Sequence, residues 1–170
     1  MKTLNTYITE WKANSSTVFD IKHNNKFIYK VKNNSEIKIF GDSWPQIKNY
    51  KYKVYIDGKH IELDDYGWTI KKYESGTYIV DIKDIDNVTN CQCMFYFCDQ
   101  LISVPLFDTS KVDDMWQMFF RCKNLKNVPL LNTNKVESMT EMFAECDNLN
   151  EKTKNIWSKL YDFEYNEMKK

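Results

Sequence analysis

Residues 91–106 read CQCMFYFCDQLISVPL, and residues 115–130 read MWQMFFRCKNLKNVPL. The same apolar positions return in residues 139–149, MTEMFAECDNL, again 24 residues on. Self-similarity at one fixed period is typical of units that stack on one another and share a core. We expect that repeat core to consist of the matched apolar positions, which are Met94, Phe95, Cys98, Leu101, Met118, Phe119, Cys122, Leu125, Met142, Phe143, Cys146 and Leu149.

Each unit suggests a strand and a helix. Leu101, Val104 and Leu106 have the L-x-x-L-x-L spacing of a leucine-rich-repeat strand, and the segment from Val112 to Cys122 carries apolar residues at a helical period. One unit cannot bury its own apolar side, so it needs neighbours or caps at both ends. The sequence therefore predicts a short solenoid over residues 81–150.

The units at 88–106, 112–130 and 136–149 resemble the BspA-like leucine-rich repeat, with its pattern V-x-x-M-x-x-M-F-x-x-C-x-x-L-x-x-(V/I)-P-L. The resemblance covers about 70 of the 170 residues. It implies a solenoid that serves adhesion and protein contact, with no established catalytic residues. It also implies a setting on bacterial surface proteins or in phage and mobile genes of gut bacteria.

Residues 15–80 have the texture of β-structure. Asp57-Gly58 lies between two strand-like runs and is the strongest hairpin signal, because both residues tolerate positive φ. A small antiparallel sheet or sandwich is expected here, with strands at 27–31, 36–40, 50–56, 59–63 and 77–80.

Both ends of the chain show helical patterns. Leu4, Tyr7, Ile8 and Trp11 share one face of a helix over residues 1–14, which we expect to dock on or cap the protein. Residues 151–170 are expected to form a C-terminal capping helix. The predicted class is therefore α+β, with an N-terminal helix, an antiparallel β domain, a leucine-rich-repeat-like solenoid and a capping helix.

The N-terminal pattern lacks the apolar core of a secretory signal, and no apolar run approaches the roughly 20 residues of a spanning helix. We therefore expect no membrane insertion, and a virion or the cytoplasm is favoured over independent secretion. The net charge of zero gives no argument for nucleic-acid binding.

The cysteines are the first candidates for chemistry. Cys98, Cys122 and Cys146 share a position in the repeat, so stacking predicts a column of buried, reduced thiols, with a disulfide as the alternative in an oxidising compartment. Cys91 and Cys93 lack the further ligands of a zinc site. No metal and no cofactor are expected.

Catalytic patterns are missing from the sequence. His23 and His60 belong to no recognised motif, and the carboxylates of Asp64-Asp65 and Asp113-Asp114 diverge on a strand or a helix. We expect a protein that is not an enzyme. An enzyme that uses the β domain is the least favoured alternative.

The remaining function classes are structural or binding roles. Tyr96, Trp116 and Phe120 lie off the matched apolar positions and are the predicted partner contacts, together with Leu4, Tyr7, Ile8 and Trp11. The leading hypothesis is a non-catalytic protein-interaction component of a larger assembly or homo-oligomer, such as an accessory virion protein. The alternative is a surface adhesin module that binds a glycan or a host protein.

The neutral charge hides an asymmetry between the two halves. Residues 1–80 contain 13 basic and 9 acidic side chains, whereas residues 81–150 contain 6 basic and 11 acidic ones. This pattern predicts that the halves dock on each other or that copies meet head to tail.

Overall fold

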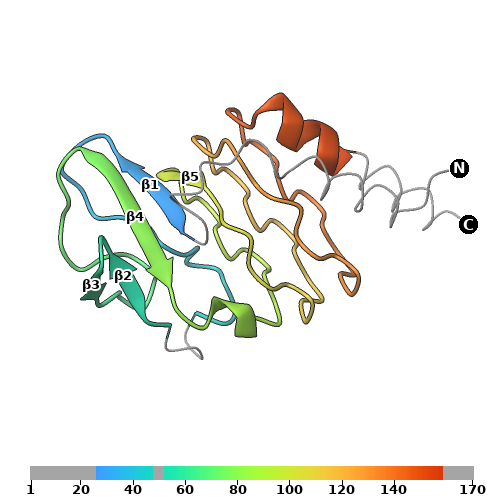
Figure 1. Ribbon diagram of the computed structural model, residues 1–170, viewed down its shortest axis with the longest axis horizontal. Coiled ribbons are helices and arrows are strands. Elements are labelled where there is room, and N and C mark those ends of the chain that lie inside the picture. Colours follow the sequence, from blue (N-terminus) through green and yellow to red (C-terminus); the bar gives the residue numbers. More distant parts are fainter. Residues whose placement is uncertain (1–25, 48–51, 159–170) are drawn as a thin grey trace, which may run out of the picture.

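An antiparallel sheet, a set of turn-rich units beside it and one α-helix make up residues 26–47 and 52–158, the part of the chain that the computed structural model describes (Figure 1). The sheet has the strand order β3-β2-β4-β1-β5, and all neighbouring strands are antiparallel. The elements are β1 (Phe27–Val31), β2 (Val54–Ile56), β3 (Lys59–Ile61), β4 (Gly76–Ile82), the 3-10 turn η2 (Ile85–Asn87) and β5 (Leu101–Ser103).

The sheet forms where apolar and polar residues alternate. In β1, Phe27, Tyr29 and Val31 are buried, so one face of the strand packs into the core. β4 is the longest strand and lies between β1 and β2. The β2–β3 hairpin closes through Asp57 and Gly58, whose φ angles of 48° and 82° fit the positive-φ turn expected for this pair.

The stretch 36–40 is buried but is not a strand, although its alternation predicted one. It makes an isolated bridge between Lys38 and Trp68. The Ile37 N–H donates to the hydroxyl oxygen of Thr69 (2.9 Å) instead of a carbonyl, which breaks the regular ladder. The β-forming residues of this stretch are therefore buried in the core without adding a strand to the sheet.

The repeat units consist of successive turns, and the helix predicted within each unit is wrong. The N–H groups of Met94 and Tyr96 donate to the carbonyls three residues earlier. The N–H groups of Cys93 and Phe95 point toward the next unit and donate, at 2.9 Å each, to carbonyls 23 residues ahead in the sequence. An α-helix would pair every N–H with the carbonyl four residues back.

The leucine-rich-repeat strand predicted in each unit is also wrong. Residues 101–103 form β5, but β5 pairs antiparallel with β1, with Ser103 opposite Ile28. The matching residues of the second unit contribute an isolated parallel bridge, from Asn127 to Ser103. The predicted solenoid class is therefore corrected to a single five-stranded antiparallel sheet, followed by turn-rich units and one C-terminal helix in the described residues.

The expected terminal helices have different outcomes. The predicted helix at 1–14, with its contact residues, lies outside the described residues. A C-terminal helix is present at 151–158, and Asn150 caps it by accepting the N–H of Thr153 on its side-chain oxygen (2.7 Å). Its Trp157 is buried and lies 5.3 Å, between ring centroids, from Phe143 of the third unit.

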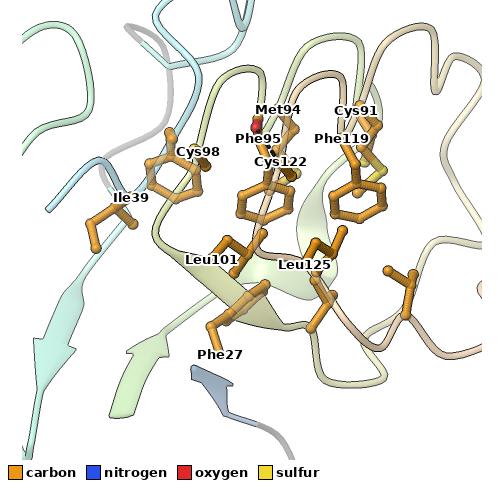
Figure 2. Packing of buried hydrophobic residues seen from close by; sticks show 14 of the residues in the cluster. Phe27, Ile39, Cys91, Met94, Phe95, Cys98, Leu101, Phe119, Cys122 and Leu125 are labelled. Carbon is orange, nitrogen blue, oxygen red and sulfur yellow. Dashed lines mark hydrogen bonds between the residues drawn. The ribbon is translucent and has the colours of Figure 1, made fainter. Parts of the chain in front are cut away.

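A column of phenylalanine rings runs through the core of the units. The rings of Phe95 and Phe119 lie parallel, with centroids 5.5 Å apart (Figure 2). Phe119 and Phe143 repeat this arrangement at 5.4 Å. At the sheet end, Phe27 of β1 lies 5.4 Å from Phe95. The buried residues of the sheet, the units and the helix therefore form one continuous cluster.

One position of each unit carries an amide side chain that reaches the backbone of the neighbour before it. Asn148 donates to a carbonyl of the second unit (2.6 Å), and Asn124 to a carbonyl of the first (2.7 Å). At this position in the first unit, Gln100 donates to the Glu36 carbonyl (2.9 Å) and accepts the Lys38 N–H (3.0 Å). The 36–38 segment thus takes the place of a preceding unit.

Gly41 completes this junction by close approach. Its N–H donates to the Met94 carbonyl (2.8 Å), and a Cβ at this position would overlap the Cys93 carbonyl and lie 2.7 Å from the Tyr96 nitrogen. The first two of these atoms belong to the backbone of the first unit and the third neighbour is the Tyr96 Cβ, so the first unit cannot make room without disturbing its own ladder.

Changing Gly41 to Ala should therefore destabilise the protein by about 2–3 kcal/mol through overpacking. Gly76→Ala is the matched control, since the nearest heavy atom to its new Cβ is 3.6 Å away. Urea unfolding of both variants measures the difference, and equal stability of the two would contradict the close approach.

Phe119 touches a ring on each side and is fully buried. Phe119→Ala should lower the free energy of unfolding by about 3–5 kcal/mol, because it leaves a cavity in the middle of the column. Leu106→Ala removes a side chain that is 57% exposed and should change the stability far less. Comparable losses in the two variants would show that the column is not the core of the units.

Candidate functional site

Three half-buried aromatic rings lie together on the surface of the first two units. Phe97 lies 4.5 Å from Tyr96 and 5.8 Å from Phe120, measured between ring centroids, and Tyr96 and Phe120 stack at 5.3 Å. We call these rings the aromatic ridge, together with the two cations that contact them, Lys38 and Arg121, and the Trp68 indole, which lies against Lys38.

Backbone geometry directs this cluster outward. Phe97 and Arg121 hold the same position in successive units, and both have a φ of 59°. The Phe97 N–H donates to the Phe120 carbonyl (2.9 Å), which fixes the two units against each other at this corner. Each non-glycine residue in this left-handed region costs roughly 1 kcal/mol.

Lys38 joins the β region to the rings of the repeat. Its Nζ lies 5.6 Å from the centroid of Trp68 and 6.0 Å from that of Phe97, within the range of cation–π attraction. The side chain is only 6% exposed, and Asp42 balances its charge with a carboxylate oxygen 3.2 Å from Nζ. A buried ammonium between two rings and a carboxylate ties together segments that are far apart in the sequence.

Arg121, the only arginine in the chain, covers the other side of the rings. Its guanidinium carbon lies 5.0 Å from the centroid of Phe97 and 5.7 Å from that of Phe120. Nε donates to the Glu145 carboxylate at 2.5 Å, and this hydrogen bond raises the pKa of Arg121 above its ordinary value. The guanidinium is therefore held in place over the rings.

A shallow pocket of about 520 Å³ adjoins the ridge at Trp68. Glu36, Asp64, Thr69 and Ile70 line the rest of it. Ile70 is 69% exposed, which is unusual for a large apolar side chain. The ridge thus continues into a hollow with an apolar wall and two carboxylates.

The predicted contact residues have different positions in the structure. Tyr96 and Phe120 lie in the ridge, whereas Trp116 is half-buried and has no ring contact with the ridge among the described residues. Leu4, Tyr7, Ile8 and Trp11 lie outside the described residues. The partner contacts predicted from the sequence did not include Phe97, Arg121, Lys38 or Trp68. The signal in the repeat that could have indicated this cluster is a lone arginine that directly follows two aromatic residues.

The predicted repeat-core residues lie on the inner side of the units. Eleven of the twelve are buried, and Phe143, at the end of the column, is half-buried. Val88, Val112, Cys91 and Met115 are buried beside them. These buried side chains pack beneath the surface that carries the ridge.

The five cysteines are buried free thiols. Burial raises the pKa of each, to about 11 for Cys93 and about 12 for Cys146, so they hold their protons at neutral pH. The Cys122 thiol donates to the Phe95 carbonyl at 3.0 Å, and the Cys146 thiol to the Phe119 carbonyl at 2.9 Å. The thiols of Cys122 and Cys146 thus link each of these residues to the unit before it.

Other candidates for chemistry stand apart from one another. His60 is exposed on β3, with Nδ1 3.7 Å from Glu62, and His23 lies outside the described residues. Asp114 accepts the N–H of Trp116 (2.7 Å) and so serves a turn. Within residues 26–47 and 52–158, no group of three His, Cys, Asp or Glu side chains is placed to hold a metal, and no helix is long and apolar enough to span a bilayer.

A family model described as "Mycoplasma protein of unknown function, DUF285" matches residues 64–168, which is more than half of the chain. No curated protein matches the chain, and no solved structure does. The predicted membership in the BspA-like leucine-rich-repeat family is therefore wrong. The solenoid predicted from the repeat, and the phage origin and adhesion that the resemblance implied, have no support in the matched family or the fold.

The thiols give a testable pH dependence. Their pKa values lie above that of an unfolded thiol, about 8.5, so above pH 9 the unfolded chain binds fewer protons than the native one. The free energy of unfolding should therefore fall as the pH rises from 8 to 10, and each buried thiol steepens the fall.

Cys122→Ala should flatten this decline by up to about 1.4 kcal/mol per pH unit. Val112→Ala, which truncates an equally buried side chain that does not titrate, should keep the wild-type slope. Denaturant unfolding at several pH values measures both. Identical slopes in all three proteins would mean that Cys122 ionises as readily in the native state as in the unfolded chain.

Proposed function

The chain belongs to the DUF285 family of mycoplasma proteins of unknown function, and we propose that it is a non-catalytic interaction module that binds another protein through its aromatic ridge. The observation that carries this proposal is the unbroken series of ring and cation contacts from Trp68 through Lys38 and Phe97 to Arg121.

The residue types of the ridge are those that dominate binding energy at protein interfaces. Tyr, Trp and Arg are the side chains whose removal most often costs more than about 2 kcal/mol of affinity. Here the rings contact one another already in the free protein, and Arg121 is held by Glu145. Little side-chain entropy remains to be lost on association, which favours affinity.

The charges of the ridge favour a protein partner over a polyanion. Lys38 and Arg121 each have a carboxylate neighbour, Asp42 and Glu145 respectively. Because a carboxylate neutralises each cation, the surface carries little net positive charge. It presents flat apolar rings and the edge of an oriented guanidinium group. Such a surface recognises shape and apolar groups, and the pocket beside Trp68 offers space for one protruding side chain.

The proposal is tested by replacing the exposed parts of the ridge. Cell extract passed over the immobilised full-length protein should yield a partner whose captured amount falls at least roughly tenfold with Tyr96→Ala combined with Arg121→Gln. Tyr66→Ala is the matched control, because Tyr66 is 61% exposed and lies outside the ridge.

A photo-reactive amino acid at position 96 should cross-link to that same partner, and thermal unfolding checks that each variant is folded. Equal capture by the wild type, the double variant and the control, or cross-linking that does not depend on Arg121, would contradict binding through the ridge.

A further inference from the structure

The pocket of about 520 Å³ beside Trp68 contains two carboxylates whose charge no neighbour neutralises. Glu36 is half-buried and Asp64 is exposed. Within residues 26–47 and 52–158, neither carboxylate forms an ion pair with a lysine, an arginine or a histidine. The pocket therefore differs from the rest of the ridge, where each cation has its own carboxylate.

Two lysines adjoin the pocket, and each has its ammonium group against other partners. Lys38 contacts the Trp68 ring, but its side chain is only 6% exposed and its Nζ lies 3.2 Å from Asp42. Lys71 directly follows the pocket residue Ile70, and its Nζ lies 5.0 Å from the centroid of the Tyr73 ring. The negative charge of the pocket is thus left for a group from outside.

Backbone contacts hold both carboxylates in position. Asp64 Oδ1 accepts the N–H groups of Tyr66 and Trp68, at 2.9 Å each, whereas Oδ2 has no hydrogen-bond partner in the described part of the chain. The backbone of Glu36 is fixed to the first unit, because its carbonyl accepts the side-chain amide of Gln100 (2.9 Å). A site whose charges are already placed loses little entropy when a ligand binds.

The remaining walls of the pocket are mainly apolar. Trp68 is half-buried, and Ile70 is 69% exposed. The Thr69 hydroxyl accepts the Ile37 N–H and donates to the Lys71 carbonyl, both at 2.9 Å, so its hydrogen-bonding capacity is largely used within the protein. An indole and a carboxylate both attract cations, and an exposed aliphatic group packs on an apolar stem.

This combination of groups fits an organic cation better than a metal ion or a sugar. Calcium takes six to eight oxygen ligands, and no group of three His, Cys, Asp or Glu side chains in the described residues is placed to hold a metal. A neutral sugar has no positive charge to place against the two carboxylates. A lysine or arginine side chain has both the charge and the apolar stem.

We propose that the pocket binds a lysine or arginine side chain of the partner protein. The ammonium or guanidinium group meets the carboxylates of Glu36 and Asp64, and the aliphatic stem packs against Trp68 and Ile70. This inference rests on the proposed function, because it names the residue type that the partner brings to the Trp68 end of the aromatic ridge.

The test is an NMR titration of the full-length, isotopically labelled chain with three small probes at low ionic strength. N-acetyl-arginine amide and N-acetyl-lysine amide carry the proposed cation, and N-acetyl-norleucine amide carries a similar stem without charge. Both cationic probes should shift the Trp68 indole N–H and Ile70 amide resonances at millimolar concentration, and the norleucine probe should bind roughly tenfold more weakly. Added salt should weaken only the cationic probes.

Matched charge variants locate the binding site. Glu36→Gln keeps the shape of the side chain and should weaken the arginine probe roughly fivefold. Glu62→Gln makes the same change at a 77% exposed carboxylate that does not line the pocket, and it should alter the affinity less than about twofold. Equal binding of the norleucine probe, the same shifts with methyl glucoside, or equal effects of the two variants would each overturn the proposal.

Partner capture separates this proposal from that of the ridge. Glu36→Gln should reduce the captured amount of the ridge partner at least roughly threefold. Capture that depends on Tyr96 and Arg121 but not on Glu36 would overturn the pocket proposal and leave the ridge proposal in place. Binding of the arginine probe that depends on Glu36, without capture of any partner, would contradict the ridge proposal and still support the selectivity of the pocket for a cation.

Discussion

Over residues 91–97 and 115–121, every second backbone N–H finds its acceptor in the next unit, and the structure is organised around this constraint. The turn that buries Met94 and Phe95 satisfies alternate amides locally and directs the others toward the next unit. A unit alone would leave these groups unpaired, at a cost of about 1–3 kcal/mol for each one that is buried. Neighbours are therefore required for polar reasons as well as for apolar burial.

The junction with the sheet solves the same problem at the other side of the stack. The first unit has no unit before it, and the 36–41 segment supplies what a unit would have supplied. Gly41 donates to the carbonyl of Met94, and Gln100, one methylene longer than the asparagines at its position in later units, spans to Glu36 and Lys38. Because the segment is shaped to the repeat, it cannot also run as a regular strand. The aromatic ridge follows from this junction, since Lys38 meets Trp68 and Phe97 only where the segment crosses the first unit.

The sequence predicted the period and the buried positions, but it could not reveal the backbone conformation between them. Apolar residues three and four apart, such as Met115, Met118, Phe119 and Cys122, have the spacing of an amphipathic helix. A series of tight turns brings the same positions to one side, so the spacing of apolar residues does not distinguish such turns from a helix. The deciding fact is the direction of alternate N–H groups, which depends on the neighbouring unit and has no local sequence signal. Only part of the ridge could be predicted, for a related reason. Tyr96 and Phe120 are aromatic residues outside the matched apolar positions of the repeat, whereas nothing in the local sequence distinguishes Lys38 and Trp68 from other residues of the β region.

Several residues of the repeat have a left-handed backbone conformation, and this bears on the role of their side chains. Six non-glycine residues, two in each unit, have φ between 52° and 59°: Cys93, Phe97, Gln117, Arg121, Glu141 and Glu145. Glycine would hold these corners without the steric penalty of roughly 1 kcal/mol each, yet all four glycines of the chain lie outside the repeat. Some of these side chains offset the penalty by contacts within the stack, as Arg121 does with Glu145. Phe97, however, projects a large apolar ring to the surface at a strained position, and a buried core gains nothing from that. The proposed binding role would account for a large ring at this corner, because a ring held rigidly at the surface can be reached by a partner.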